Sequence, residues 1–479
     1  MRGCMVIRPW GYGIWERIQR LMDDRIKAAG VENCYFPLFI PLGYFAKEAE
    51  HVDGFAKEMA VVTHHRLIAQ GDGKLIPDPD ARLEEPLVVR PTSETVIGEA
   101  MSRWVQSWRD LPLLTNQWAN VVRWEMRTRM FLRTSEFLWQ EGHTAHADEP
   151  EAMGETLRAL EMYRSFAEGE LAMPVIAGEK PEHERFPGAV ATYSIEAMMQ
   201  DGKALQAGTS HYLGTGFSKA AGIQYQDKDG AQQWCHTTSW GVSTRLIGGV
   251  IMTHGDDDGL RVPPQIAPQQ IVILPMLRDD DGDEDLLAYC ADIQRELAKL
   301  SAFQEPVRVM LDKRPGKATQ KRWGWVKKGV PLILEIGGRD VAAGLVSVIR
   351  RDQLWNDKAK VNFTGLPRDE FIAGAAAQLE TIQVSLFTEA AERRNAKINR
   401  EVTSFDELKA FFDEGNRHPG WVELGWSRPT GAELDGVMEK LKALKLTMRN
   451  TPLDAEPVDG TCIFTGKPAA ERIYIARAY

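Results

Sequence analysis

Residues 117–146 constrain the fold of this chain more than any other stretch. Two apolar runs flank a polar loop that is rich in arginine. The first run contains Val121 and Val122, the second contains Phe137, Leu138 and Trp139, and the loop carries Arg127, Arg129 and Arg133. Short apolar runs on either side of a polar segment predict two strands joined by a long hairpin loop.

Polar residues at alternate positions of this hairpin predict a binding surface. Residues two apart on a strand share a face, so Arg123 is expected to point the same way as Glu125, and Trp139, Glu141 and His143 to form one row. Guanidinium groups match phosphate oxygens, and a carboxylate beside them can hold an ammonium group. A solvated hairpin with cross-strand ion pairs is the alternative that the spacing leaves open.

An amphipathic helix is predicted to begin after Thr92 and Ser93, with Glu94 in its first turn. Apolar residues recur at helical spacing in this stretch: Val96, Ile97, Ala100, Met101, Trp104, Val105 and Trp108. Thr, Ser and Glu are common helix-capping residues, which would explain them without any binding role. A helix start also places side chains at the mouth of a pocket, so both interpretations can hold together.

Helices and strands alternate through the rest of the first half. We expect a helix within residues 1–30, a strand at 34–40 closed by Pro41, a helix at 155–168 and a strand at 191–195. The polar segment 206–211 contains a glycine, which is typical of a turn. Residues 239–245 lead into an apolar helix, in which Gly248 and Gly249 permit close packing.

The second half begins after a proline-rich linker at residues 263–269. Beyond it, short strands alternate with helices, which predicts a small α/β domain. The expected strands lie at 271–274, 307–311, 331–336 and 341–349, and later helices at roughly 367–395 and 404–414. The acidic run 279–285 is typical of a solvated loop. A length of 479 residues allows about three domains.

A basic segment at residues 313–328 predicts contact with nucleic acid. It carries Lys313, Arg314, Lys317, Lys321, Arg322, Lys327 and Lys328 without an intervening acid. Trp323 and Trp325 are interleaved with them, which fits phosphate contact combined with base stacking. A solvated helix face is the alternative.

Composition restricts location and cofactors. The five cysteines (Cys4, Cys34, Cys235, Cys290 and Cys462) show no disulfide framework or metal-type spacing, which favours a reducing cytoplasm. We expect no membrane span and no signal peptide. His143 and His146 lie three apart on a predicted strand and should face opposite sides, which disfavours a metal site. The net charge of −10 argues mildly against a nucleic-acid partner.

Arg123-Trp124-Glu125 and, after the loop, Arg133-Thr134-Ser135-Glu136-Phe137 resemble motif 2 of the class II aminoacyl-tRNA synthetases. The continuation LWQEGHTAH resembles the prolyl-tRNA synthetases, in the archaeal and eukaryotic-like form without the large bacterial editing insertion. The resemblance covers essentially the whole chain: the N-terminal helix, strand and Pro41 resemble motif 1, Arg245 the motif 3 arginine, and RPGKATQ…KKGVPLILEIGGRD an anticodon-binding domain. Relatives usually carry a segment before RGCMVIRPWGYG, so we expect the true N-terminus upstream of Met1.

The resemblance implies a fold with three domains. An α+β catalytic domain with an antiparallel sheet is expected at residues 1–265, a small α/β anticodon-binding domain at 266–370 and an α/β C-terminal domain at 371–479. About 60 residues separate the hairpin from Gln206, too few for an editing domain. Many relatives bind zinc in the C-terminal domain through four cysteines. Two of those cysteines form a C-x-x-C pair late in the chain, and here Thr465 stands in place of the second one after Cys462. One thiolate cannot build a tetrahedral site, so we expect no zinc.

The function implied by the resemblance is the ATP-dependent attachment of L-proline to proline tRNA through prolyl-adenylate. ATP and Mg²⁺ are the expected cofactors, and the protein is expected to be a cytoplasmic homodimer without membrane or DNA partners. The alternatives are a catalytically silent synthetase-like protein that binds RNA or regulates, and a class II synthetase for another amino acid. The first alternative is disfavoured because the motif arginines Arg123, Arg133 and Arg245 are intact. The second is disfavoured because the chain carries the residues that the resemblance assigns to proline binding: Thr92, Glu94, Trp139, Glu141 and His143.

The resemblance also carries functional residues onto this sequence. The expected catalytic residues are Arg123, Arg133 and Arg245. Proline is expected to contact Thr92, Glu94, Arg123, Trp139, Glu141, His143 and Ser239. ATP is expected to contact Arg123, Glu125, Arg133, Thr134, Phe137, Gln206, Thr209, His211, Ser243 and Arg245, with Mg²⁺ near Glu125 or Glu136. Relatives of this form often end in a tyrosine, here Tyr479, whose carboxylate approaches the active site.

Overall fold

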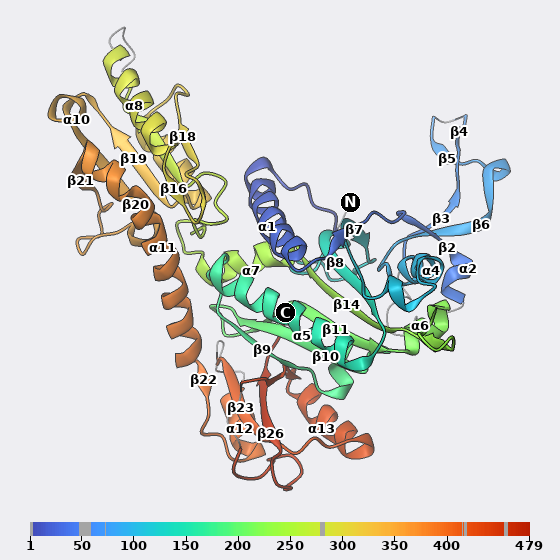
Figure 1. Cartoon of the computed structure of the whole chain (residues 1–479). Coiled ribbons are helices and arrows are strands. Elements are labelled where there is room, and N and C mark those ends of the chain that lie inside the picture. The colour runs from blue at the N-terminus through green and yellow to red at the C-terminus, as the bar shows by residue number, and fades with distance from the viewer. Residues whose placement is uncertain are drawn as a thin grey trace.

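The computed structural model describes residues 3–46, 59–71, 73–277, 283–413, 415, 419–454 and 458–479. Figure 1 shows a large central sheet with one smaller α/β unit above it and another below it. They are called the upper unit and the lower unit below. Residues 279–282 of the acidic run lie outside the described residues, and the end of that run begins helix α8 (Glu284–Leu297). Among the described helices, none combines the length and apolar character needed to cross a bilayer.

The central sheet has eight strands in the order β1-β7-β8-β14-β11-β10-β9-β25. β1 pairs with β7 in parallel, and the other described pairs are antiparallel, which confirms the predicted antiparallel sheet. The strands are β1 (Glu32–Asn33), β7 (Leu113–Val122), β8 (Glu136–His146), β9 (Val175–Glu179), β10 (Ala191–Met198), β11 (Ala204–Gly214), β14 (His236–Ser243) and β25 (Thr451–Pro452).

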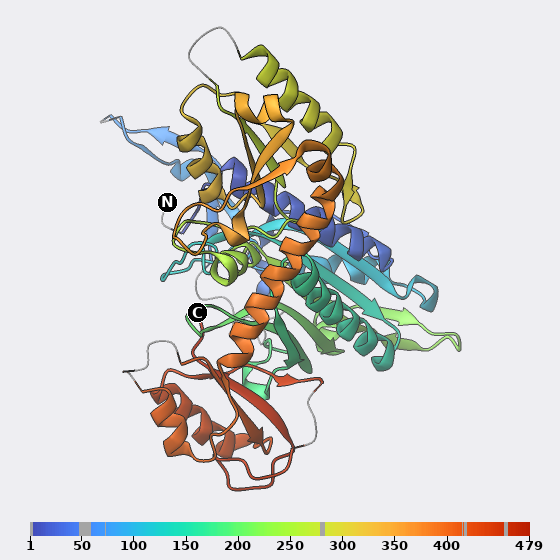
Figure 2. The ribbon, with the colours of Figure 1, turned by 90° about the vertical axis from the view of Figure 1, so that its left-hand side faces the viewer.

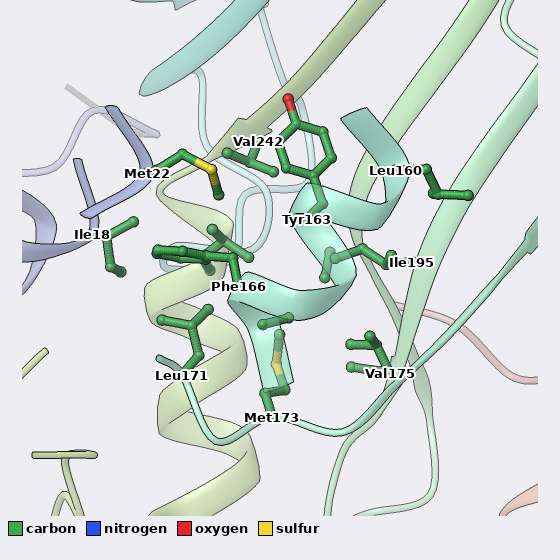
Figure 3. Close-up of a cluster of buried hydrophobic side chains, with 14 of the residues drawn as sticks. Ile18, Met22, Leu160, Tyr163, Phe166, Leu171, Met173, Val175, Ile195 and Val242 are labelled. Carbon is green, nitrogen blue, oxygen red and sulfur yellow. The ribbon is translucent and has the colours of Figure 1, made fainter. Parts of the chain in front are cut away.

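Three helices share an apolar core with this sheet: α1 (Pro9–Ala28), α5 (Glu149–Gly169) and α7 (Arg245–His254). The predicted amphipathic helix near the N-terminus is therefore confirmed as α1. Figure 3 shows Ile18 and Met22 of α1 beside Phe166 of α5, with Val242 of β14 close to them. This core fixes the sheet on which the functional residues stand.

The predicted hairpin is confirmed by the pairing of β7 with β8, which places Gln117 opposite Glu141. One detail of the prediction is wrong, because β7 ends at Val122 and both Arg123 and Glu125 lie in the loop. The backbone N–H of Arg123 donates to the carbonyl of Ser135 at 2.8 Å, which closes the hairpin just beyond the strand ends. The side chain of Arg123 therefore lies at the junction of sheet and loop.

Two other predictions for the first half are wrong. Residues 34–40 do not form one strand: β1 ends at Asn33, and β2 (Phe39–Pro41) belongs to another sheet. Pro37 explains the break, because proline has no N–H for a strand ladder. Residues 206–211 are not a turn but lie within β11, where they pair with β10. The glycine in this segment allows a β-bulge next to it rather than a turn.

Helix α4 (Glu94–Trp104) is shorter than the pattern predicted. Ser107 and Asp110 form a capping box that begins the separate turn η2 (Trp108–Asp110), so the helix cannot continue through it. The capping interpretation would require the hydroxyl of Ser93 to cap α4, but it does not. It donates to Glu141 at 2.5 Å, which ties the helix start to the central sheet.

A small sheet with the order β2-β6-β3 lies beside α4 and is joined to α2 (Leu42–Ala46). It contains β3 (Val61–His64) and β6 (Arg82–Val89), and a hairpin of β4 (Leu67–Ala69) and β5 (Leu75–Pro77) extends from it. Figure 1 shows this hairpin projecting away from the body. Several of its apolar side chains are exposed, among them Leu67 and Leu75.

The upper unit contains a five-stranded sheet with the order β18-β15-β19-β20-β21, and this confirms the predicted small α/β domain. Its elements besides α8 are β15 (Ile271–Pro275), β18 (Val309–Leu311), α9 (Ala318–Lys328), β19 (Leu332–Ile336), α10 (Gly338–Ala343), β20 (Leu345–Arg350) and β21 (Thr364–Pro367). The strand predicted at 341–349 is wrong at its start, where α10 ends. Gly344 terminates that helix in the left-handed conformation, with φ 64°.

Helix α9 carries most of the predicted basic segment, but two of its residues are buried rather than available to nucleic acid. Lys321 donates to the carbonyls of Asp312 and Arg314 at 3.3 and 3.1 Å. The indole of Trp325 donates to the Asp312 carboxylate at 2.8 Å. The prediction of phosphate contact by Lys321 and base stacking by Trp325 is therefore wrong. Lys313 and Lys317, which precede the helix, are exposed.

Helix α11 (Arg368–Ala396) connects the upper unit to the lower one, as Figure 2 shows. Its first half, including Phe371 and Leu379, packs in the core of the upper unit, so the helix spans the boundary expected at residue 370. The lower unit holds a four-stranded sheet with the order β22-β23-β26-β24. Its elements are β22 (Ile398–Asn399), α12 (Phe405–Phe411), β23 (Trp421–Trp426), α13 (Gly431–Ala443), β24 (Thr447–Met448) and β26 (Glu471–Ala476).

The lower unit is docked on the central sheet by backbone pairing and by buried charges. β25 pairs with the edge strand β9, and Ala478 pairs with Ala204. Arg449 lies 2.7 Å and Lys180 lies 2.9 Å from the carboxylate of Glu196, which is fully buried. Burial alone would raise the pKa of Glu196, but Arg449 and Lys180 lower it to about 2. The carboxylate is therefore ionised at neutral pH and holds both cations.

Candidate active site

A cavity of about 270 Å³ lies over β8, β11 and β14 and brings most of the predicted residues together. The predicted residues that line it are Thr92, Glu94, Arg123, Phe137, Trp139, Glu141, Gln206, Thr209, His211, Ser239, Ser243 and Arg245. A second cavity of about 310 Å³ shares Arg123, Phe137, Ser243 and Arg245 with the first. It adds Glu125, Arg133 and Thr134, so the two cavities form one site with two compartments.

Two carboxylates define one end of the first cavity. Glu94, in the first turn of α4, accepts hydrogen bonds from the hydroxyl of Thr92 and from the hydroxyl of Ser239, the latter at 3.3 Å. Glu141 accepts from Ser93 and from the amide of Gln117, each at 2.5 Å. These donors fix the orientation of the two carboxylates, so this part of the cavity can receive an ammonium group.

His143 lies behind Glu141 rather than in the wall of the first cavity. Its Nε2 is 2.9 Å from the Glu141 carboxylate, and its side chain borders a smaller cavity that it shares with Glu94. Burial would lower the pKa of His143, but the hydrogen bond and the charge of Glu141 raise it. A protonated His143 would orient Glu141 without touching a molecule bound in the first cavity.

Two arginines, Arg123 and Arg245, line both cavities and therefore lie where the two compartments meet. The Nε of Arg123 donates to the carbonyl of Pro91 at 2.9 Å, and its guanidinium lies 5.6 Å from the Phe137 ring and 5.5 Å from the Trp139 ring. Arg245 donates to the carbonyls of Leu132 and Gln206, which are neutral acceptors. The charge of Arg245 is thus held in place but not neutralised by these contacts, as an anion site requires.

The arginines repel one another inside the site. Burial, together with the charges of Arg123 and Arg133, lowers the pKa of Arg245 to about 10. Burial also lowers the pKa of Arg123, while Glu94 and Glu141 oppose that shift. Both groups stay cationic at neutral pH. A bound polyanion would relieve the repulsion, so this end of the site is suited to phosphate groups.

His211 lines the first cavity together with Gln206 and Thr209 of the same strand, β11. Its Nδ1 is 3.0 Å from the hydroxyl of Thr192, and the Phe186 ring lies 4.8 Å from its ring. Burial lowers the pKa of His211 to about 4, against the attraction of Glu94. His211 is therefore a neutral imidazole at neutral pH and adds no further positive charge.

Sequence reasoning missed several residues of the site. Residues 184–187 border the first cavity from the end of η3 (Glu182–Glu184) and the loop after it, and Thr192 and Trp240 line it from strands. The only sequence signal for the loop is Pro187-Gly188, which marks a turn but no chemistry. Trp240 depends on Gly142 in the neighbouring strand: a Cβ at Gly142 would lie 2.2 Å from the indole. A contact of that kind is set by strand register and has no local pattern.

The comparisons with known proteins agree with this geometry. Residues 78–254 match the family model of the tRNA synthetase class II core domain (G, H, P, S and T), and residues 270–374 match that of an anticodon binding domain. The chain is 77% identical to a proline–tRNA ligase of Novosphingobium aromaticivorans, covering 100% of this chain and 93% of that protein. It is 72% identical to the proline–tRNA ligase of Sphingopyxis alaskensis, over 100% of this chain and 90% of the relative.

A solved structure is similar over the same extent. The crystal structure of a prolyl-tRNA synthetase from Cryptosporidium parvum, complexed with L-proline and AMP, superimposes with a TM-score of 0.87 at 35% identity. The match covers 100% of this chain and 91% of that chain.

Proposed function

This chain belongs to the proline–tRNA ligases, which are prolyl-tRNA synthetases of class II, and from that premise we propose how its residues divide the reaction. The enzyme attaches L-proline to tRNA at the expense of ATP. The observation that carries the proposal is a cavity that is lined by Glu94 and Glu141 and shares Arg123 and Arg245 with a second compartment. An amino acid that reacts with a phosphate group needs an ammonium site beside an anion site.

Glu94 and Glu141 bind the ammonium group of proline, and Thr92, Ser239 and His143 hold these carboxylates in orientation. Trp139 packs on the proline ring. The carboxylate of proline attacks the α-phosphorus of ATP, and the bond to the bridging oxygen of the β-phosphate breaks. Prolyl-adenylate and pyrophosphate are the products.

Arg123 donates to the α-phosphoryl oxygens and to the proline carboxylate, because it lines both compartments. Arg133 and Arg245 hold the outer phosphates. Phe137 stacks on adenine, and Gln206, Thr209, His211, Ser243 and Thr134 supply polar contacts to the nucleotide. No residue acts as a general base here. The chain contributes position and fixed positive charge where negative charge develops.

Glu125 fits a magnesium ion better than Glu136 does. Glu125 lines the second cavity, and its carboxylate lies 3.8 Å from Arg133. Glu136 accepts from the amide of Asn120 at 2.9 Å and lines neither cavity. Mg²⁺ binds through one or two carboxylates together with phosphate oxygens and water. When bound, the ion neutralises the polyphosphate, and Glu125 would hold it beside Arg133.

The second step transfers the prolyl group to the terminal adenosine of proline tRNA. The upper unit supports this step because it matches an anticodon binding domain and carries exposed Lys313 and Lys317. Three domains then divide activation, tRNA binding and support of the catalytic sheet, with the boundary between the second and the third placed within α11 rather than at residue 370.

A homodimer in the cytoplasm completes the proposal. Exposed apolar side chains gather on the first 105 residues, including Tyr35, Val61, Leu67, Leu75 and Trp104. Exposed apolar side chains of this kind would be buried against a second copy of the chain. Light scattering during gel filtration should give twice the chain mass, and a single-chain mass would contradict the dimer. The five cysteines are all free, which suits a reducing compartment.

The lower unit is proposed to fold without zinc. Cys462 is buried in its apolar core, and its polar neighbours are the hydroxyls of Ser427 and Thr465, which are poor zinc ligands. Metal analysis of the purified protein should show no stoichiometric zinc. One zinc per chain would overturn this proposal.

The decisive experiment is ATP–pyrophosphate exchange with each amino acid in turn, followed by charging of proline tRNA. Exchange should depend on proline and exceed that with any other amino acid. Absence of exchange in a folded protein would favour a silent, RNA-binding or regulatory protein, which the comparisons do not favour. A preference for another amino acid would mean that the protein is a class II synthetase specific for that amino acid.

A further inference from the structure

Another cavity, called the interdomain cavity below, lies away from the candidate active site, where three parts of the chain meet. It has a volume of about 460 Å³ and lies between α5 and β9 of the catalytic unit, the last turn of α11, and the sheet of the lower unit. Small-molecule sites in proteins have volumes of roughly 300–1,000 Å³, often where domains meet. The size and position are therefore those of a binding site.

The lining of this cavity carries an excess of positive charge. Four arginines face it, from three different parts of the chain: Arg164, Arg394, Arg400 and Arg472. Two carboxylates, Glu423 and Asp454, face them. Arg164 is already paired with Glu161 at 2.7 Å, so the other three positive and the two negative groups leave a net charge of +1 in the lining, in a protein whose overall charge is −10. A local excess of this sign is not explained by composition.

Glu423 is already counted in this sum, and its carboxylate is occupied by bonds to its own neighbours. It is buried and accepts from Arg400 at 2.9 Å, from Arg472 at 2.8 Å and from the hydroxyl of Tyr474 at 2.9 Å. Among the described residues, each arginine reaches Glu423 through one nitrogen only. Further N–H groups of Arg400 and Arg472 therefore remain for another acceptor.

Arg394 supplies the least neutralised charge. Its guanidinium donates at 3.1 Å to the carbonyl of Val175 and to the side-chain oxygen of Asn395, which are both neutral. Within the part of the chain that the structure describes, no carboxylate forms an ion pair with it. Burial lowers the pKa of Arg394 and the charge of Arg400 adds to this, although Glu168 opposes the shift. An anion bound in the cavity would favour the charged form of Arg394 and offset its repulsion from Arg400.

We propose that this interdomain cavity binds a phosphate group, either of a free polyphosphate or of an RNA strand. Arg394 and Arg400 would donate to the phosphate oxygens, since guanidinium groups match them in geometry and charge. Because α5, α11 and the lower unit all contribute to the cavity, the ligand would link the three parts. The proposal does not depend on the residue roles proposed for the catalytic site.

Inorganic pyrophosphate is the first probe, measured by isothermal titration calorimetry in an Arg245→Ala background. That background weakens phosphate binding in the catalytic site. Pyrophosphate should bind saturably, and adding Arg394→Gln should weaken this binding by about tenfold or more, as for the loss of a charge-assisted hydrogen bond. Arg400→Gln, at a half-exposed position, should act in the same direction. Arg295→Gln, at an exposed arginine of α8, is the charge-matched control and should have no effect.

Proline tRNA is the second probe, measured in variants that retain Arg245. If RNA supplies the phosphate, Arg394→Gln should reduce the salt slope of tRNA binding by about one unit, and pyrophosphate should compete. If a free polyphosphate supplies it, tRNA binding should stay unchanged while pyrophosphate binding is lost. Normal proline-dependent exchange would show that Arg394→Gln is folded. Pyrophosphate binding that resists both cavity variants, with an unchanged tRNA slope, would overturn the proposal.

Discussion

Arg123 has the most connected position in the catalytic site. It follows the last residue of β7, contacts the Pro91 carbonyl and lies against the rings of Phe137 and Trp139. These contacts fix the guanidinium before any substrate arrives. A preorganised donor needs no rearrangement during the reaction, which makes it effective toward developing charge.

Replacing Arg123 by alanine should reduce proline-dependent ATP–pyrophosphate exchange by about 10²–10³, the loss expected for a preorganised donor. The fold should persist, because the hairpin is closed through the backbone of residue 123. Circular dichroism and thermal unfolding would check this. Arg103→Ala, at an exposed position of α4, is the control. Near-normal exchange in folded Arg123→Ala would refute the assignment.

The proline end of the cavity predicts a specific error. A site of this kind excludes larger side chains by collision, but each missing methylene is worth only about 1–3 kcal/mol. Cysteine is close to proline in volume and keeps the ammonium and carboxylate groups that Glu94, Glu141 and Arg123 are proposed to bind. We therefore expect measurable activation of cysteine, better than that of alanine. Exchange assays with the three amino acids would rank them.

Mischarged tRNA should persist, because about 60 residues between β8 and Gln206 leave no room for an editing domain. In the structure this stretch is occupied by α5, β9 and β10 of the catalytic unit itself. Labelled cysteinyl-tRNA can be followed with and without enzyme. Rapid hydrolysis that depends on the enzyme would reveal an editing activity.

Among single residues, sequence reasoning succeeded where the site follows strand periodicity. Trp139 and Glu141 share a face because side chains alternate along a strand, and both line the cavity. It could not identify Gln117 as the donor to Glu141, because that contact depends on the register between β7 and β8. Phe186 was missed for a similar reason, since only the folded loop brings it to His211.

Helix α9 shows the same limit at the scale of an element. The run of basic and aromatic residues was expected to contact nucleic acid, with a solvated helix face as the alternative, and most of it forms α9. It could not tell which residues the helix turns inward, and Lys321 and Trp325 bond to Asp312 instead of facing solvent. The exposed basic residues of the segment include Lys313 and Lys317 before the helix and Lys327 within it.

Reversing the charge of Lys313 and Lys317 together should weaken tRNA binding. The salt slope should fall by roughly one unit for each lost phosphate contact. Proline activation should be unaffected, because it takes place in the catalytic unit. Filter binding at several salt concentrations would measure the slope. Lys299→Glu, at an exposed lysine after α8, is the control, and an unchanged slope in the double variant would indicate a solvated face.

Element predictions failed where proline or a neighbouring strand decided the outcome. Residues 34–40 are apolar enough for one strand, but Pro37 interrupts the ladder and the two ends join different sheets. Residues 206–211 look like a turn in isolation. They form a strand because β10 and β14 pair on both sides of them, which is a tertiary effect.

At the scale of the molecule, Glu196 couples the catalytic sheet to the lower unit. Its pKa is about 2 in the folded protein against a usual value of 4.5. A lowered pKa contributes stability that is fully present above about pH 4.5 and is lost as the pH falls toward about 2. The docking of the lower unit should therefore weaken in acid over that window.

Glu196→Gln would leave Arg449 and Lys180 buried without their counter-charge, at a cost of about 3–5 kcal/mol. It should also remove this part of the pH dependence. Urea unfolding at neutral pH and at about pH 4 would measure both effects. Glu296→Gln, in an exposed pair with Lys299, should change neither. Equal stability of Glu196→Gln and the natural chain would show that the buried charges do not support docking.

The pairing of β25 with β9 has a consequence for the behaviour of the protein in concentrated solution. β9 is the last strand that the catalytic unit itself contributes, and an uncovered edge strand is a template for other chains. β25 covers it at close range: a Cβ on Gly178 would lie 2.2 Å from the Thr451 carbonyl. Two residues from the far end of the chain thus suppress edge-to-edge aggregation of the sheet that carries out catalysis.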